Sequence, residues 1–135
     1  MEKRIFVSTA VMALGLATAA VASDGPTPPA GRAIEVRMVD VSATEYRFEP
    51  AQISVLPGDT VRFIQAGAMP HNVEFQQVPP GTNLGSAKMG PFLLKKGDTY
   101  NVAIDARFAT GAHSFVCTPH QGFGMRGTIT VAGGR

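Results

Sequence analysis

The chain of 135 residues is poor in cysteine, in histidine and in charge of one sign. It has one cysteine and three histidines, and its 12 basic and 10 acidic residues leave a net charge of +2. A lone cysteine excludes an internal disulfide, and the lack of any run of like charge argues against a nucleic-acid binder, which usually carries a basic stripe. No segment shows an apolar helical repeat over three turns, which argues against a helical domain. The length predicts one domain.

The first 22 residues predict an export signal. Lys3 and Arg4 precede an apolar stretch over residues 5–20 that is rich in small side chains, and Ala20-Val21-Ala22 fits a small-x-small cleavage site. We therefore expect cleavage after Ala22 and a periplasmic mature protein. An uncleaved membrane anchor is the alternative, although the stretch is short for a membrane span.

The remainder of the chain has the texture of a β-protein. Residues 23–32 are dominated by proline and glycine and predict a flexible lead-in, which leaves residues 33–135 for the domain. Short runs of alternating apolar residues, separated by turn signals roughly every ten residues, predict an all-β sandwich or barrel. The longest irregular stretch, residues 77–90, has room for one helical turn at most. The alternating residues are Ile34, Val36 and Met38; Ile53 and Val55; Val61 and Phe63; His71, Val73 and Phe75; Tyr100, Val102 and Ile104; His113, Phe115 and Cys117; and Ile129 and Val131.

The residues with chemical potential gather near the C-terminus. Cys117, His120 and Met125 have the spacing C-x2-H-x4-M, and His71 lies upstream in the segment Met69-Pro70-His71-Asn72. Together they supply one thiolate, two imidazoles and one thioether, which is the donor set of a blue-copper site. Zinc more often takes four cysteine or histidine ligands, or three ligands and water, and methionine is a poor zinc ligand. The set therefore predicts a site for one copper ion.

Each of these residues has a plainer interpretation when taken alone. Cys117 alone is a small buried side chain or pairs with another chain, and Met125 alone is a core methionine. His71 alone is a polar residue on a turn. The joint spacing makes the metal site the better hypothesis. His113 shares its strand parity with Cys117 but lies about 13 Å away along an extended strand, so we expect it to have a structural role.

Three segments resemble the cupredoxin, or type 1 blue copper, family of the plastocyanin and pseudoazurin kind. Residues 111–131 (GAHSFVCTPHQGFGMRGTITV) resemble the copper loop and last strand of plastocyanin. Residues 57–63 (PGDTVRF) and 70–75 (PHNVEF) resemble the central segments of the family. The resemblance covers residues 34–132, which is nearly all of the expected mature chain.

The resemblance implies both a fold and a copper site. The implied fold is an all-β, eight-stranded Greek-key sandwich with copper at one end. The implied equatorial ligands are His71, Cys117 and His120, and the implied axial ligand is Met125. In this family the asparagine after the first histidine fixes the copper loops by hydrogen bonding, and Asn72 matches that position. Partners of this kind orient the ligands and tune the metal.

The resemblance also implies a soluble carrier of single electrons and not an enzyme. Plant plastocyanins have an acidic flank where residues 76–82 read QQVPPGT, and an exposed tyrosine where this chain has Val116. We therefore expect docking at the apolar end around His120 and not at the flank. The residues of this end are Met69, Pro70, Pro119, Gly122, Phe123 and Gly124.

By analogy, the expected partners are a c-type cytochrome, a copper-containing reductase or a dehydrogenase. We expect a monomer without nucleic-acid binding or stable membrane insertion. One alternative is a copper carrier or storage protein on the same fold. A small copper oxidase or reductase is a second alternative, but it would need an open coordination position or a second metal, and three histidines leave little material for either.

Overall fold

The computed structural model describes residues 30–133, and its described part contains eight strands and two short 3-10 helices. The predicted leader over residues 1–22 and residues 23–29 of the predicted lead-in lie outside the described residues. The strands are β1 (Ala33–Ser42), β2 (Glu45–Glu49), β3 (Gln52–Val55), β4 (Thr60–Gln65), β5 (Glu74–Phe75), β6 (Thr99–Ala103), β7 (Gly111–Val116) and β8 (Arg126–Val131). The helices are η1 (Gly85–Lys88) and η2 (Thr118–Phe123).

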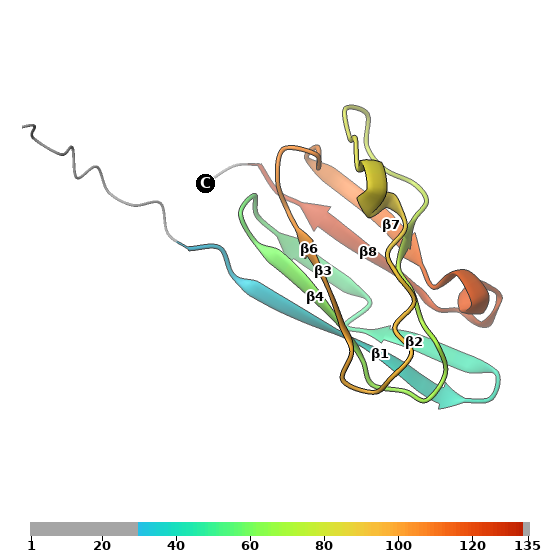
Figure 1. Cartoon of the computed structure of the whole chain (residues 1–135). Helices are drawn as coiled ribbons and strands as arrows, with labels where there is room; N and C mark the ends of the chain where they lie inside the picture. The colour runs from blue at the N-terminus through green and yellow to red at the C-terminus, as the bar shows by residue number, and fades with distance from the viewer. Residues whose placement is uncertain (1–29, 134–135) are drawn as a thin grey trace, which may run out of the picture.

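The strands form two four-stranded sheets that pack face to face (Figure 1). One sheet has the order β2-β1-β4-β6 and the other the order β3-β8-β7-β5. The pairs β1–β4 and β3–β8 are parallel, and the other pairs are antiparallel. Because most neighbours in each sheet are not consecutive in the chain, the chain crosses repeatedly between the sheets. The predicted eight-stranded Greek-key sandwich is confirmed.

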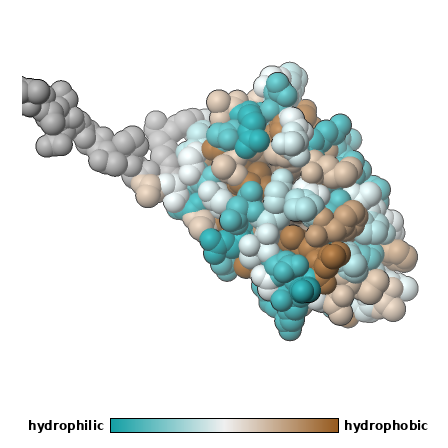
Figure 2. All heavy atoms as spheres, in the orientation of Figure 1, coloured by the Kyte–Doolittle hydropathy of each residue, from teal (hydrophilic) through white to brown (hydrophobic). Residues whose placement is uncertain are grey.

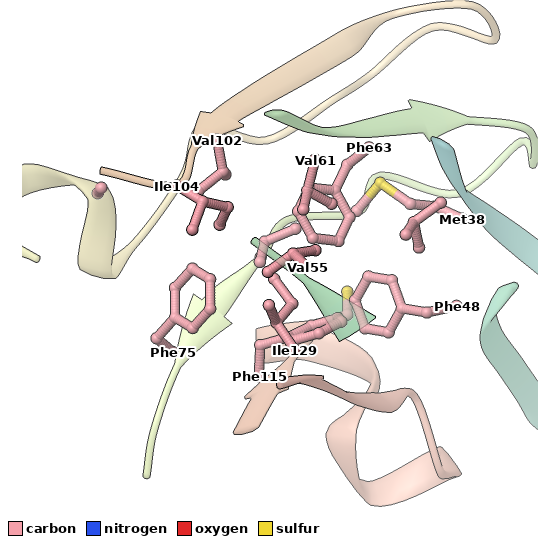
Figure 3. Close-up of a cluster of buried hydrophobic side chains, with 14 of the residues drawn as sticks. Met38, Phe48, Val55, Val61, Phe63, Phe75, Val102, Ile104, Phe115 and Ile129 are labelled. Atoms are coloured by element: carbon pink, nitrogen blue, oxygen red, sulfur yellow. The ribbon is translucent and has the colours of Figure 1, made fainter. Parts of the chain in front are cut away.

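The core lies between the sheets and is centred on Phe115 of β7. Its ring centroid lies 4.8 Å from that of Phe48, 5.3 Å from that of Phe63 and 5.9 Å from that of Phe75 (Figure 3). These rings come from β2 and β4 in one sheet and from β5 in the other, so Phe115 joins both layers. Large aromatic side chains supply much of the apolar area that a core buries. A Cβ at Gly127 would overlap the Phe115 ring, so this close approach requires glycine.

The segment after Pro70 departs from the expected strand. His71 and Val73 continue the apolar alternation in the sequence, yet only β5 is a strand in this region. Pro70 has no N–H to donate to a ladder. His71 instead makes an isolated antiparallel bridge with Leu93. The irregular backbone leaves the His71 side chain free to point toward the end of the sandwich.

The end of the sandwich that matters for function is built from β1, β2 and η2. The turn between β1 and β2 lies near η2, opposite the end where the described chain begins (Figure 1).

The irregular residues 77–90 contain one short helical turn, η1, as the sequence predicted. Within residues 30–133, no helix is long and apolar enough to cross a membrane.

Candidate metal centre

His71, Cys117 and His120 meet at this end of the sandwich. His71 lies between β4 and β5, where its backbone exchanges hydrogen bonds of 3.2 and 2.7 Å with that of Leu93. Cys117 directly follows β7, and His120 lies in η2. The ligand atoms of the three side chains all lie within 4.8 Å of one another. Two parts of the chain that are distant in sequence are thus brought to one point.

The segment with the spacing C-x2-H-x4-M closes on itself. The chain turns into η2 directly after Cys117, with Pro119 in the first turn, where its missing N–H is tolerated. The backbone N–H of His120 donates to Cys117 O at 3.1 Å, and Gly124 ends the turn at φ +84°. Met125 N then donates to His120 O, and Cys117 N donates to Met125 O at 3.1 Å. The fully buried Met125 is therefore held in the same loop as the other two residues.

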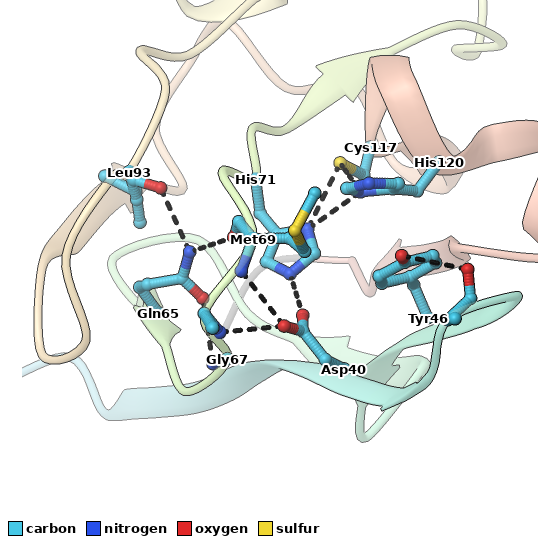
Figure 4. Close-up of polar contacts among 11 residues, drawn as sticks. Asp40, Tyr46, Gln65, Gly67, Met69, His71, Leu93, Cys117 and His120 are labelled. Carbon is cyan, nitrogen blue, oxygen red and sulfur yellow. Dashed lines mark hydrogen bonds and ion pairs between the residues drawn. The ribbon is translucent and has the colours of Figure 1, made fainter.

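The three ligand atoms form a small and nearly regular triangle. His71 Nδ1 lies 3.1 Å from His120 Nδ1, and Cys117 Sγ lies 3.6 and 3.4 Å from these two nitrogens (Figure 4). A point equidistant from all three lies about 2.0 Å from each, close to the distances of about 2.0–2.1 Å for nitrogen and 2.3 Å for sulfur around a zinc ion. These atoms can hold one metal ion. A thiolate with two imidazoles and a thioether in the same loop suits copper.

Burial controls protonation in the metal-free site. Burial raises the pKa of the Cys117 thiol, and hydrogen bonds from the backbone N–H groups of Asn72 and His120 oppose this effect. Burial also lowers the pKa of His120, and the nearby His71 lowers it further. At neutral pH the metal-free site therefore holds a neutral thiol and a neutral His120 imidazole. A bound metal ion must displace the thiol proton.

Asn72 joins the two loops that carry the ligands. Its Oδ1 accepts a hydrogen bond of 2.8 Å from Thr118 N, and its Nδ2 donates to Thr118 Oγ1 at 2.9 Å. Thr118 Oγ1 in turn donates to Glu74 Oε2 at 3.0 Å. The predicted hydrogen-bonding role of Asn72 is confirmed, because the residue after His71 is tied to the residue after Cys117.

Two residues that no sequence pattern indicated contact the imidazoles. Asp40 Oδ1 lies 2.6 Å from His71 Nε2. Tyr46 stacks on His120 with ring centroids 3.9 Å apart and planes 17° from parallel. Both residues come from the β1–β2 hairpin, so no local spacing could reveal them. The Tyr46 ring also explains why His120 is only 7 % exposed.

The third histidine lies apart from the site. His113 is fully buried, with Nε2 3.1 Å from Thr82 Oγ1 and Nδ1 3.1 Å from Gly111 O. Burial lowers the pKa of His113. Within the described residues, His113 is not a member of the group that could hold a metal. Its contacts agree with the predicted structural role.

Comparisons with known proteins agree with this geometry. Residues 35–132 match the family model for copper-binding proteins of the plastocyanin/azurin family. The plastocyanin of Prochlorothrix hollandica is 37% identical over 105 residues, which cover 77% of this chain and 76% of that protein. The chloroplastic plastocyanin of Pisum sativum is 33% identical over 132 residues, which cover 95% of this chain and 76% of that protein.

Solved structures show the same relationship. A mutant fern plastocyanin matches with a TM-score of 0.59 and 30% identity, covering 72% of this chain and 98% of that chain. An oxidised amicyanin variant matches with a TM-score of 0.55 and 34% identity, covering 73% of this chain and 81% of that chain. Proteins of this kind are electron carriers and not enzymes. This chain belongs to the plastocyanin/azurin family of copper-binding proteins.

Proposed function

We propose that this protein is an exported one-electron carrier whose single type 1 copper ion is held by His71, Cys117, His120 and Met125. The observation that carries the proposal is the triangle of two imidazole nitrogens and one thiol sulfur. When bound, copper would supply the one-electron couple between Cu(II) and Cu(I). The two sulfur donors suit Cu(I), and the imidazoles accommodate Cu(II).

The surroundings of the ligands support rapid electron exchange. His71, Cys117 and Met125 are fully buried, and the hydrogen bonds of Asn72 tie their loops together. Because these contacts hold the side chains in one arrangement, the ligands need to move little when the charge at the site changes. A copper carrier or storage protein would benefit from a site that opens more readily. The buried frame therefore favours the electron carrier.

The central test uses the thiolate. We expect the copper-loaded protein to be intensely blue or blue-green and to be bleached by ascorbate. Cys117→Ser should lose the colour, because an oxygen ligand cannot reproduce thiolate-to-copper charge transfer. A Cys117→Ser variant as blue as the parent would contradict the assignment. Copper that passes readily to a chelator or an apo-acceptor, without rapid redox exchange, would favour the carrier or storage alternative.

Exposed apolar side chains beside the site support a docking role for this end. Phe123, whose ring centroid lies 6.5 Å from that of His120, is 47% exposed. Met69 and Leu94 are also exposed, and Leu94 follows the residue that bridges to His71. Figure 2 shows apolar side chains gathered on one part of the viewer-facing surface. Such a patch suits brief, weak docking of a redox protein, by analogy a c-type cytochrome, a copper-containing reductase or a dehydrogenase.

The docking site is tested by placing a charge on it. Phe123→Lys should keep the visible spectrum of the parent but slow electron exchange with the physiological partner, or with a small c-type cytochrome as a surrogate. The added charge must lose water when the surfaces meet. The matched control is Gln77→Lys, which adds the same charge on the exposed flank. If Gln77→Lys slows exchange and Phe123→Lys does not, electrons enter through the flank.

The export and periplasmic location that we propose rest on the leader over residues 1–22, which lies outside the described residues. The basic start, the apolar stretch and the Ala20-Val21-Ala22 pattern support cleavage after Ala22. The exported protein should therefore have an intact mass that begins at Ser23. Recovery of the full-length chain tightly bound to membranes would contradict this part of the proposal.

A further inference from the structure

The Asp40 carboxylate of β1 contacts both the ring and the backbone of the His71 segment. Asp40 Oδ1 lies 2.6 Å from His71 Nε2, on the side of the ring away from Cys117 and His120 (Figure 4). Asp40 Oδ2 accepts hydrogen bonds from Ala68 N at 2.7 Å and Met69 N at 3.0 Å. One side chain therefore contacts three nitrogens and connects β1 to the segment that presents His71.

The shape of the segment is adapted to this carboxylate. A Cβ at Gly67 would overlap the Asp40 carboxylate, so the approach of the backbone requires glycine. Gln65 holds the same turn from the other side, because its Oε1 accepts from Gly67 N at 3.0 Å and its Nε2 donates to Met69 O. The Asp40 side chain is 21% exposed, and the contacts with this turn hold its carboxylate in place beside the imidazole.

The contact determines which nitrogen of His71 is available to a metal. A carboxylate accepts hydrogen bonds, so it places the imidazole proton on His71 Nε2. The hydrogen bond made by one ring nitrogen determines which nitrogen binds a metal. His71 Nδ1, which faces Cys117 and His120, is then the nitrogen with the free lone pair. A carboxylate partner also makes the imidazole a more basic ligand.

We propose that Asp40 is the positioning residue of His71, which fixes its ligating nitrogen and stabilises Cu(II) relative to Cu(I) at the bound copper. The second half of this statement rests on the proposed copper site, whereas the first half concerns the metal-free protein as well. The negative charge of Asp40 lies one imidazole away from the site and favours the more highly charged ion. The reduction potential of the protein is therefore lower than a neutral residue at position 40 would give.

Asparagine cannot replace this carboxylate. Asp40 receives three N–H donors on two acceptor oxygens, whereas asparagine has one acceptor oxygen and an NH2 group that is itself a donor. In Asp40→Asn, either the His71 ring or the loop backbone must lose its acceptor. The negative charge is lost in both orientations.

The first experiment is nitrogen-15 NMR of the metal-free protein and of the Cu(I) protein. In the parent, we expect His71 to carry its proton on Nε2, with a downfield signal that is protected from exchange. Asp40→Ala, which has no acceptor at this position, should lose this protection. Gly67→Ala should lose it as well while keeping the charge, because the added methyl group displaces the carboxylate. The control is Glu45→Gln, which removes a charge from an exposed position in β2 and should leave the His71 signal unchanged.

The second experiment is voltammetry of the copper-loaded variants. A residue that hydrogen-bonds to a ligating histidine, without binding the metal itself, typically contributes 10–100-fold in metal affinity. If Asp40→Asn lowers the affinity for Cu(II) about tenfold relative to Cu(I), the potential rises by about 59 mV. Glu45→Gln should shift it much less. Blue Asp40→Asn protein with the potential of the parent overturns the tuning role, and a protected Nε2–H in Asp40→Ala overturns the positioning role. A parent that binds no copper counts against the proposed function instead, and the NMR of the metal-free protein still decides the positioning.

Discussion

Replacing Asn72 with alanine should loosen the frame of the metal site before any metal is bound. The substitution removes two hydrogen bonds to Thr118, of 2.8 and 2.9 Å, from a side chain that is almost fully buried. A hydrogen bond contributes about 1 kcal/mol net, and a buried donor left without a partner costs about 1–3 kcal/mol. Because Thr118 is only half-buried, water can reach some of the Thr118 groups that lose Asn72 as their hydrogen-bond partner. We therefore expect a loss of about 2 kcal/mol in the free energy of unfolding.

Urea unfolding of the metal-free protein measures this loss, with the same slope expected for both proteins. The matched control is Asn101→Ala, which removes an exposed amide. Within the described residues, the Asn101 side chain accepts one hydrogen bond, of 3.3 Å, from Arg62 Nε. That variant should stay within about 0.5 kcal/mol of the parent. A double-mutant cycle with Thr118→Val should give a coupling of at least about 0.5 kcal/mol, since the two side chains are in contact. If Asn72→Ala and Asn101→Ala are equally stable, the clamp between the loops contributes nothing measurable and the reasoning fails.

Two further predictions concern the axial position and the start of the domain. Met125→Leu should keep copper and raise the reduction potential, because a weak axial thioether adds electron density that favours Cu(II); voltammetry that shows a large fall, or a product without copper, would refute this role. Asp59 is buried, and its pKa is held well below its ordinary value, chiefly by the hydrogen bond from Arg32. A carboxyl group with a depressed pKa stabilises the fold at pH values above about 3.9, the pKa of that group in the unfolded chain. This contribution is lost as the pH falls below that value. Asp59→Asn should therefore lower the free energy of unfolding by about 2 kcal/mol at pH 7. In urea unfolding, the difference in stability between this variant and the parent should become smaller below about pH 4. A difference that does not change with pH would contradict the explanation.

The sequence was enough to propose the candidate ligands because their arrangement is mostly local. Cys117, His120 and Met125 lie in one loop of nine residues, which four backbone hydrogen bonds close on itself. A spacing within one loop has few possible geometries, so it is informative. His71 required a second signal, the Pro-His-Asn segment, because its position depends on an isolated bridge to Leu93. Periodicity wrongly indicated a regular strand there, since it cannot detect the missing N–H of Pro70.

The sequence could not predict that Asp40 and Tyr46 contact the imidazoles of the two histidines. Asp40 is 31 positions away from His71, and Tyr46 is still further from His120. Nothing in the alternation of apolar and polar residues along the two strands distinguishes Asp40 or Tyr46 from an ordinary surface residue. Their contacts depend on how the first hairpin packs against the loops at the end of the sandwich, and no local spacing encodes that packing.

The register of the first hairpin explains how both imidazoles acquire a partner. Asp40 and Tyr46 are directly opposite each other in the β1–β2 ladder, and residues opposite each other in an antiparallel pair project to the same face. A register irregularity follows immediately, between Asp40 and Ser42, and such bulges commonly redirect side chains next to a site. One rung of the ladder thus places a carboxylate on His71 and an aromatic ring on His120. Because a slip of one residue in this pairing would turn one of the two side chains to the other face, the orientation of the two histidines depends on strand pairing as directly as it depends on the loops that contain them.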